Sequence, residues 1–190
     1  MRKCQTLSIL VILTCLCALP AFSQKSTFAG INFIFESTSG PLRPGLGLAF
    51  ERQITKHSGI ETGLYYHNYV STQYLFFQGP GGPTPATLTI SERLLSVPVL
   101  YKFFSRILNV SAGPAFDFYT GWRQRNKTAA LTVTDHSVDP NFSVGGIVKI
   151  SKRFPVGNKI FLEPELRYQV NFTFEREYAG FGVAAKYQLR

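Results

Sequence analysis

Cysteine is absent from almost the whole chain. Of 190 residues only three are cysteines, and Cys4, Cys15 and Cys17 all lie near the N-terminus. The rest of the chain therefore has no disulfide framework, no zinc knuckle and no redox pair. Long hydrophobic runs are also missing: after Gln24 no stretch approaches the roughly 18 consecutive apolar residues of a membrane-spanning helix. The domain must be held together by its core or by a bilayer.

The first residues read as an export signal. Arg2 and Lys3 precede an apolar run over 7–19, and Ala21-Phe22-Ser23 offers small residues where a signal peptidase cuts. We expect a signal peptide over 1–23, export by the general secretory route, and one barrel domain over 24–190. A lipoprotein signal is the alternative, but Thr14 and Leu16, which precede the two later cysteines, are not the small residues it needs. A retained anchor is a second alternative, although the run is short for one.

Aromatic residues are abundant, with 17 Phe and 9 Tyr, and they argue against disorder. The dominant period is two, which is typical of β-strands. One face of the segment 160–174 is wholly apolar: Ile160, Leu162, Pro164, Leu166, Tyr168, Val170, Phe172 and Phe174. The other face is polar except at its start: Phe161, Glu163, Glu165, Arg167, Gln169, Asn171 and Thr173.

Turn residues divide the chain into eight such segments. They are expected near 27–37, 45–54, 58–74, 86–104, 107–123, 141–153, 158–174 and 178–190. Connections after the second, fourth and sixth segments are tight, whereas those after the first, third and fifth are longer, including Gly79-Pro80-Gly81-Gly82-Pro83. An even number of long strands with alternating short turns and long loops predicts an all-β fold. The predicted fold is an eight-stranded antiparallel up-and-down transmembrane β-barrel after a cleaved signal peptide.

A soluble lipocalin-like barrel that binds an apolar ligand is the alternative, because it shares the alternation. Two features favour the membrane barrel. The strands exceed the five or six residues usual in soluble sheets. Small residues also recur on the polar face, where a narrow lumen has little room: Gly30, Gly63, Gly113, Gly145, Gly180 and Gly182.

Several runs carry a family resemblance. They are Ser96-Val97-Pro98-Val99-Leu100-Tyr101-Lys102 with Ser111-Ala112-Gly113-Pro114, and the strand patterns over 59–66 and 162–168. The mature chain is similar to the PorT-like, OmpX-sized family of outer-membrane β-barrel domains. That resemblance implies a bacterial outer-membrane location and a role in supporting an envelope or secretion complex.

The inward face carries an unusual amount of charge. Its charged members are Glu51, Glu61, Lys102, Asp117, Lys149, Glu163, Glu165, Arg167 and Lys186. Hairpin spacing places Glu51 opposite Glu61, with Lys102 as the candidate cation. A turn centred near 156 places Lys149 opposite Glu163. Paired charges either plug the lumen or form a selective pore for small solutes, and we favour the plug because eight strands leave room only for side chains.

No catalytic residue, metal site or cofactor is predicted. Asp135-His136-Ser137 contains triad residue types, but adjacent residues cannot form a catalytic line of hydrogen bonds. His57 and His67 are assigned to a turn and a strand. The basic aromatic cluster of Trp122, Arg123, Arg125 and Lys127 is predicted to form an outer rim that faces lipopolysaccharide rather than nucleic acid.

The sequence thus predicts a monomeric, non-enzymatic outer-membrane protein with a structural or interaction role. Its expected partners are outer-membrane lipid, lipopolysaccharide and envelope proteins that contact the loops.

Overall fold

The computed structural model describes residues 26–38, 41–79, 82–125, 140–173 and 176–189. The strands are β1 (Thr27–Ser37), β2 (Arg43–Gln53), β3 (Ser58–Gly79), β4 (Gly82–Phe103), β5 (Asn109–Gln124), β6 (Phe142–Ser151), β7 (Phe154–Pro155), β8 (Ile160–Asn171) and β9 (Arg176–Gln188). Eight long strands confirm the predicted fold class, and the two-residue β7 extends one tight hairpin. In the described part of the chain, no helix is long and apolar enough to cross a bilayer.

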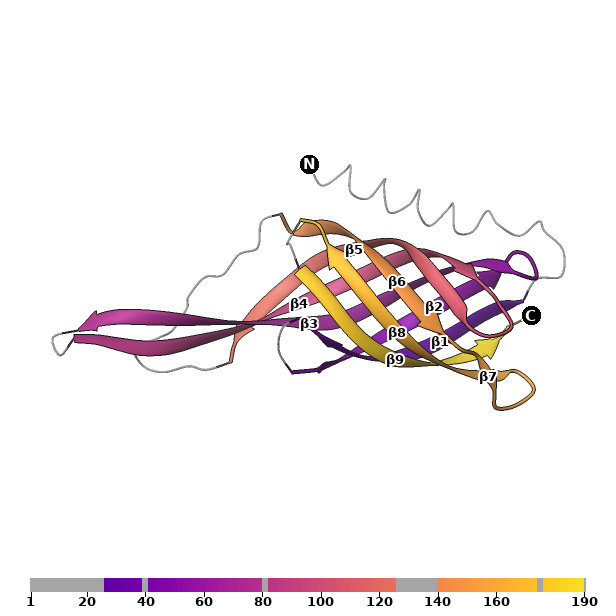
Figure 1. Ribbon diagram of the computed structural model, residues 1–190, viewed down its shortest axis with the longest axis horizontal. Helices are drawn as coiled ribbons and strands as arrows, with labels where there is room; N and C mark the ends of the chain where they lie inside the picture. The colour runs from indigo at the N-terminus through magenta and orange to yellow at the C-terminus, as the bar shows by residue number, and fades with distance from the viewer. Residues whose placement is uncertain (1–25, 39–40, 80–81, 126–139, 174–175, 190) are drawn as a thin grey trace.

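The strands form one closed antiparallel ring. Neighbours follow the order β6-β5-β4-β3-β2-β1-β9-β8, and pairing of β6 with β8 closes it, for example at Val148 and Tyr168. Figure 1 shows the tilted strands wrapping around a common axis, with the C-terminus at the end that carries the tight turns. Closure leaves no exposed strand edge along the wall of the barrel.

Alternation sorts the two faces as predicted. Glu165 and Arg167 of β8 point inward and are about 4% exposed, whereas Leu166 between them is 63% exposed. Large apolar side chains also point outward around the ring: Ile31, Phe33, Leu46, Leu48, Phe50, Leu64, Val99, Tyr101, Val110, Val148, Ile150, Phe181 and Val183. Charge inside and apolar surface outside is the reverse of a lipocalin, so that alternative is wrong.

The outward apolar surface is nearly as tall as the apolar band of outer-membrane barrels. On β4 the outward positions from Phe103 to Leu95 are apolar, and Arg93 is the next outward residue. That stretch is about 26 Å long at ~3.3 Å per residue. A strand tilt of about 40° reduces its height to about 20 Å. The value is close to the ~25 Å band of outer-membrane barrels.

The third hairpin is longer than predicted. The strand predicted to end at 74 continues to Gly79, and the strand predicted to begin at 86 already begins at Gly82. Gln78 of the first is paired with Pro83 of the second. The sequence predicts a loop over Gly79-Pro80-Gly81-Gly82-Pro83, and the structure instead places Gly79 in β3 and Gly82 and Pro83 in β4. Prolines are tolerated here because β4 pairs with β5 only from Ile90 onward, so no second neighbour requires their missing N–H groups. The hairpin projects far beyond the barrel in Figure 1.

A β-bulge changes the parity of β5. Arg93 pairs with Gly121 whereas Leu94 pairs with Tyr119, so Thr120 is an extra residue. Its hydroxyl donates a hydrogen bond of 3.0 Å to the Arg93 carbonyl. Beyond the bulge, even-numbered residues of β5 face the lumen, as the buried Gln124 shows.

Glycines allow neighbouring strands to approach closely on the inner face. A Cβ on Gly113 would collide with the Val99 carbonyl of β4, whereas one on Gly146 would meet only the Phe172 ring at 3.7 Å. A Cβ atom would also collide with the backbone of the neighbouring strand at Gly30, Gly145 and Gly180. These glycines agree with the predicted narrow lumen.

We expect Gly113→Ala to destabilise the barrel by about 1–3 kcal/mol, because two paired backbones must separate to admit the methyl group. Gly146→Ala is the matched control and should cost little. Urea unfolding in detergent micelles measures both. Equal free energies of unfolding for the two variants would contradict the steric argument.

Candidate functional site

The centre of the lumen is a cluster of three carboxylates and two ammonium groups. Glu51 and Glu61 lie opposite each other across β2 and β3, as predicted. Lys102 donates hydrogen bonds of 2.9 Å to Glu51 and 3.0 Å to Glu61, and it also contacts Glu163. Lys186 binds the same three carboxylates at 2.8, 3.2 and 3.0 Å. Lys102 is thus the counter-ion that the sequence indicated, and Lys186 is a second one.

These three glutamates also have the spacing of a metal site, since one oxygen from each lies within 4.8 Å of the others. The two ammonium groups already supply positive charge to the same oxygens. Lys149 also contacts Glu61, and Arg153 contacts Glu51 and Glu163, so cationic side chains of the chain itself neutralise the cluster.

The predicted pair of Lys149 and Glu163 is wrong. Lys149 pairs with Arg167 across β6 and β8, and its ammonium group binds Glu165 at 2.9 Å and also Glu61. The hairpin is two residues longer than assumed: β7 continues the pairing, and Val156 N–H donates to the Ile160 carbonyl at 2.9 Å. The turn is centred at 158 rather than 156. Because the shift is even, every side chain keeps its predicted face.

Arg153 closes the lumen at the tight-turn end. Its guanidinium contacts Glu51 and lies 3.1 Å from Glu163, and it stacks over the Phe28 ring with 4.3 Å to the centroid. Arg153 is not among the charged residues predicted for the lumen, because it lies at the end of a predicted strand. Its position is an even number of residues from Lys149, and this spacing places both side chains on the lumen face, so the alternation could have identified it.

A second polar layer lies above the central cluster. Glu36 is hydrogen-bonded to His67 Nδ1 at 3.0 Å and forms an ion pair with Arg167 at 2.8 Å. Asp117 accepts hydrogen bonds from Gln169 at 2.9 Å and from Asn171 at 2.8 Å. His67, which was assigned only to a strand, therefore belongs to the lumen network.

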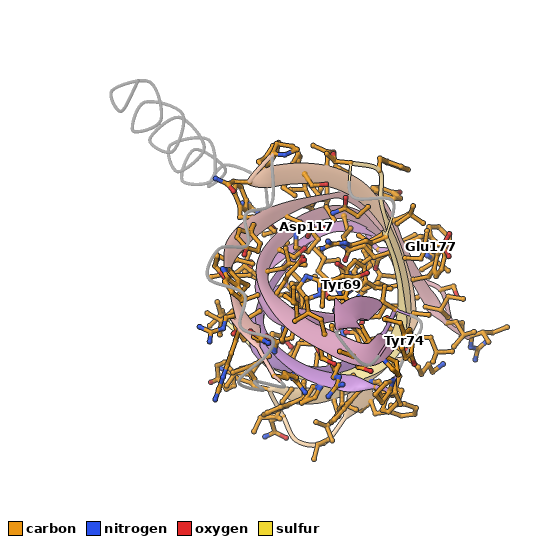
Figure 2. The ribbon with its side chains drawn as sticks, turned by 90° about the vertical axis from the view of Figure 1, so that its left-hand side faces the viewer. Tyr69, Tyr74, Asp117 and Glu177 are labelled. Atoms are coloured by element: carbon orange, nitrogen blue, oxygen red, sulfur yellow. The ribbon has the colours of Figure 1, made fainter. Side chains whose placement is uncertain are left out.

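A third layer occupies the mouth at the loop end. Arg176 pairs with Glu92 at 2.6 Å and lies over the Tyr69 ring at 3.8 Å. Tyr178 is 1% exposed and contacts the His67 ring at 5.1 Å. Figure 2 looks along the barrel from this end and shows Tyr69 and Asp117 within the ring of strands, while Glu177 lies outside it.

All nine predicted lumen residues are buried, and the network is wider than predicted. The described part of the lumen has seven acidic side chains: Glu36, Glu51, Glu61, Glu92, Asp117, Glu163 and Glu165. It also has seven permanent cations: Arg43, which lies opposite Glu36, and Lys102, Lys149, Arg153, Arg167, Arg176 and Lys186. This balance limits the cost of burying so many charges, because every one of these acidic groups except Asp117 forms an ion pair.

The predicted outer rim divides into two faces. Arg123 and Arg125 are exposed on the outside. Trp122 instead pairs with the buried Glu92, and opposite residues of an antiparallel pair share a face, so the indole lies on the lumen side. The prediction of a lipid-facing Trp122 is wrong because the bulge at Thr120 reverses the alternation. Lys127 and Asp135-His136-Ser137 lie outside the described residues.

Two solved structures share this architecture. OprG, an outer-membrane protein of Pseudomonas aeruginosa, matches with a TM-score of 0.56 at 9% identity, over 87% of this chain and 95% of that one. A major outer-membrane protein of Thermus thermophilus matches with a TM-score of 0.54 at 10% identity, over 87% and 99% of the two chains. The chain has the fold of a small outer-membrane β-barrel. At these identities the likeness concerns the fold alone. No protein-family model matches the chain, and no curated protein matches its sequence.

Proposed function

We propose that the chain is an integral protein of the bacterial outer membrane whose sealed barrel has a structural or interaction role. The observation that carries this proposal is the lumen itself, which is filled by three layers of paired charges from Arg153 to Arg176. A filled lumen offers no path for a solute. The function therefore resides on the outer wall and beyond the mouth.

The projecting part of the β3–β4 hairpin is the candidate interaction element. From Asn68 to Gly79, β3 continues for about 35 Å at ~3.3 Å per residue beyond the apolar wall. Tyr74 in this part is 78% exposed, which is unusual for a tyrosine without a partner surface. Unpaired strand edges and exposed aromatic side chains are typical of surfaces that bind other proteins.

The more specific role that we propose is the one implied by the resemblance to PorT-like proteins, which is support of an envelope or secretion complex. In this proposal the chain acts as a monomer without catalysis or a cofactor, after removal of a signal peptide over 1–23. Its apolar wall contacts membrane lipid, and its hairpin contacts an envelope protein.

Site-specific photo-crosslinking in whole cells tests the interaction role. We expect a photoreactive residue at Tyr74 to give a discrete protein adduct, because this side chain projects from the hairpin. The matched control is Ile107, which is 75% exposed in a tight turn at the opposite end of the barrel. Identical adducts from both positions, or none from Tyr74 in correctly folded barrels, would contradict the assignment of the hairpin.

A further inference from the structure

Three neighbouring strands change from apolar to polar at one height on the outer wall. On β3 the outward residue after Tyr66 is Asn68, and on β4 the outward residue after Leu95 is Arg93. Asn68 and Arg93 are paired across the two strands. This boundary lies at the loop-end edge of the apolar belt, where lipid headgroups begin.

The bulge on β5 adds two more cations to the same place. In a regular strand that kept Thr120 without a bulge, the alternation set by the buried Asp117 would turn Arg123 and Arg125 toward the lumen. With the bulge, both side chains point outward and are exposed. Bulges often re-aim side chains in this way near binding sites.

The re-aimed arginines enclose a groove of about 430 Å³. It is lined by Asn68, Ser91, Arg93, Arg123 and Arg125. Its lining contains three guanidinium groups and no carboxylate. Among the described residues no ion pair joins any of these three arginines to an acid, whereas the lumen arginines Arg153 and Arg167 are each paired.

We infer that this groove binds the phosphate groups of a phosphorylated glycolipid in the outer leaflet, that is, the lipid A portion of lipopolysaccharide. Guanidinium groups bind phosphate oxygens through paired, charge-assisted hydrogen bonds. The groove lies at the edge of the apolar belt, which suits a headgroup whose acyl chains lie against that belt. This inference rests on the proposed outer-membrane location and identifies the lipid that the wall recognises.

The test measures the affinity for lipid A in phosphatidylcholine nanodiscs by native mass spectrometry. The triple variant Arg93→Gln, Arg123→Gln, Arg125→Gln should bind lipid A at least about tenfold more weakly than the parent, because it removes all three charge-assisted contacts to the phosphates. Arg123→Gln alone should give a smaller loss. The matched control removes three exposed cations at the tight turns, Lys56→Gln, Arg106→Gln and Lys159→Gln, and should bind like the parent.

Chemical arms of the same experiment identify the ligand. Dephosphorylated lipid A should bind weakly, and inorganic phosphate should not compete at concentrations that leave the barrel intact. Unchanged affinity in the triple variant, equal losses in the control, or equal binding of phosphatidylglycerol would each overturn the inference. The heat-induced gel shift and incorporation into nanodiscs report folding and membrane insertion separately. A parent that enters the bilayer but shows no arginine-dependent binding refutes only the groove, whereas one that does not enter refutes the membrane location as well.

Discussion

Lys102→Met is expected to destabilise the barrel by about 3–5 kcal/mol, because it leaves buried carboxylates without one of their counter-ions. The Lys102 side chain is fully buried and contacts Glu51, Glu61 and Glu163. Urea unfolding in micelles gives the free energy, with fluorescence of the single tryptophan as the signal. Lys56→Met, at an exposed position in a tight turn, is the control and should change stability by less than about 0.5 kcal/mol.

A double-mutant cycle shows whether the effect comes from the ion pair. Glu61→Gln combined with Lys102→Met should cost less than the two single changes added together, since the pair then leaves less unmatched charge. We expect a coupling above about 0.5 kcal/mol. Additive effects would mean that the two side chains are not in contact in the folded barrel.

The second large effect concerns the lipid face. Val183 lies mid-strand on β9, points outward and pairs with Phe33 of β1, another outward apolar residue. Val183→Arg should destabilise the barrel in lipid by about 2–4 kcal/mol, which is the cost of a cation near the bilayer midplane.

The same substitution in the tight turn provides the control. Val156 is 62% exposed outside the apolar belt, so Val156→Arg should change stability by less than about 0.5 kcal/mol. Unfolding titrations in phospholipid vesicles compare the two variants. If Val183→Arg proved as mild as Val156→Arg, the outer wall would not face lipid.

The alternation of side chains was the most reliable information in the sequence. It assigned Glu163, Glu165 and Arg167 to the lumen and Leu162 and Leu166 to the outer wall, and the structure agrees. This works because one inserted residue would expose a whole row of charges to lipid, so parity within a long strand is strongly constrained.

Features that depend on a single backbone irregularity were not predictable. The turn between β6 and β8 is displaced by two residues, so the residue opposite Lys149 is Arg167 rather than Glu163, and the Lys149 ammonium group binds the neighbouring Glu165. No side chain changes face. Because of the bulge at Thr120, Trp122 points inward and Arg123 points outward. The local pattern of residue types gives no sign of this bulge. Neither the displaced turn nor the bulge changes the order of apolar and polar residues, and that order is the only information from which the strands were predicted.

Contacts between strands that are distant in the sequence could not be predicted either. Hairpin spacing brought Glu51 and Glu61 together, because they lie on consecutive strands. The contact of Lys186 with both requires closure of the ring between the first and last long strands, and its hydrogen bond to Glu51 spans 135 positions along the chain. Only the three-dimensional barrel reveals this second counter-ion.

The claim that the lumen is sealed is tested most directly by single-channel recording of the parent barrel in planar lipid bilayers. The three layers of paired charge predict no steady conductance above the bare membrane at moderate voltage, in preparations whose folding is verified by the heat-induced gel shift. Under the same conditions Lys102→Met should give measurable leak currents, because it loosens the central layer. A stable, voltage-independent open conductance in the parent would contradict the sealed lumen and favour the narrow transport pore.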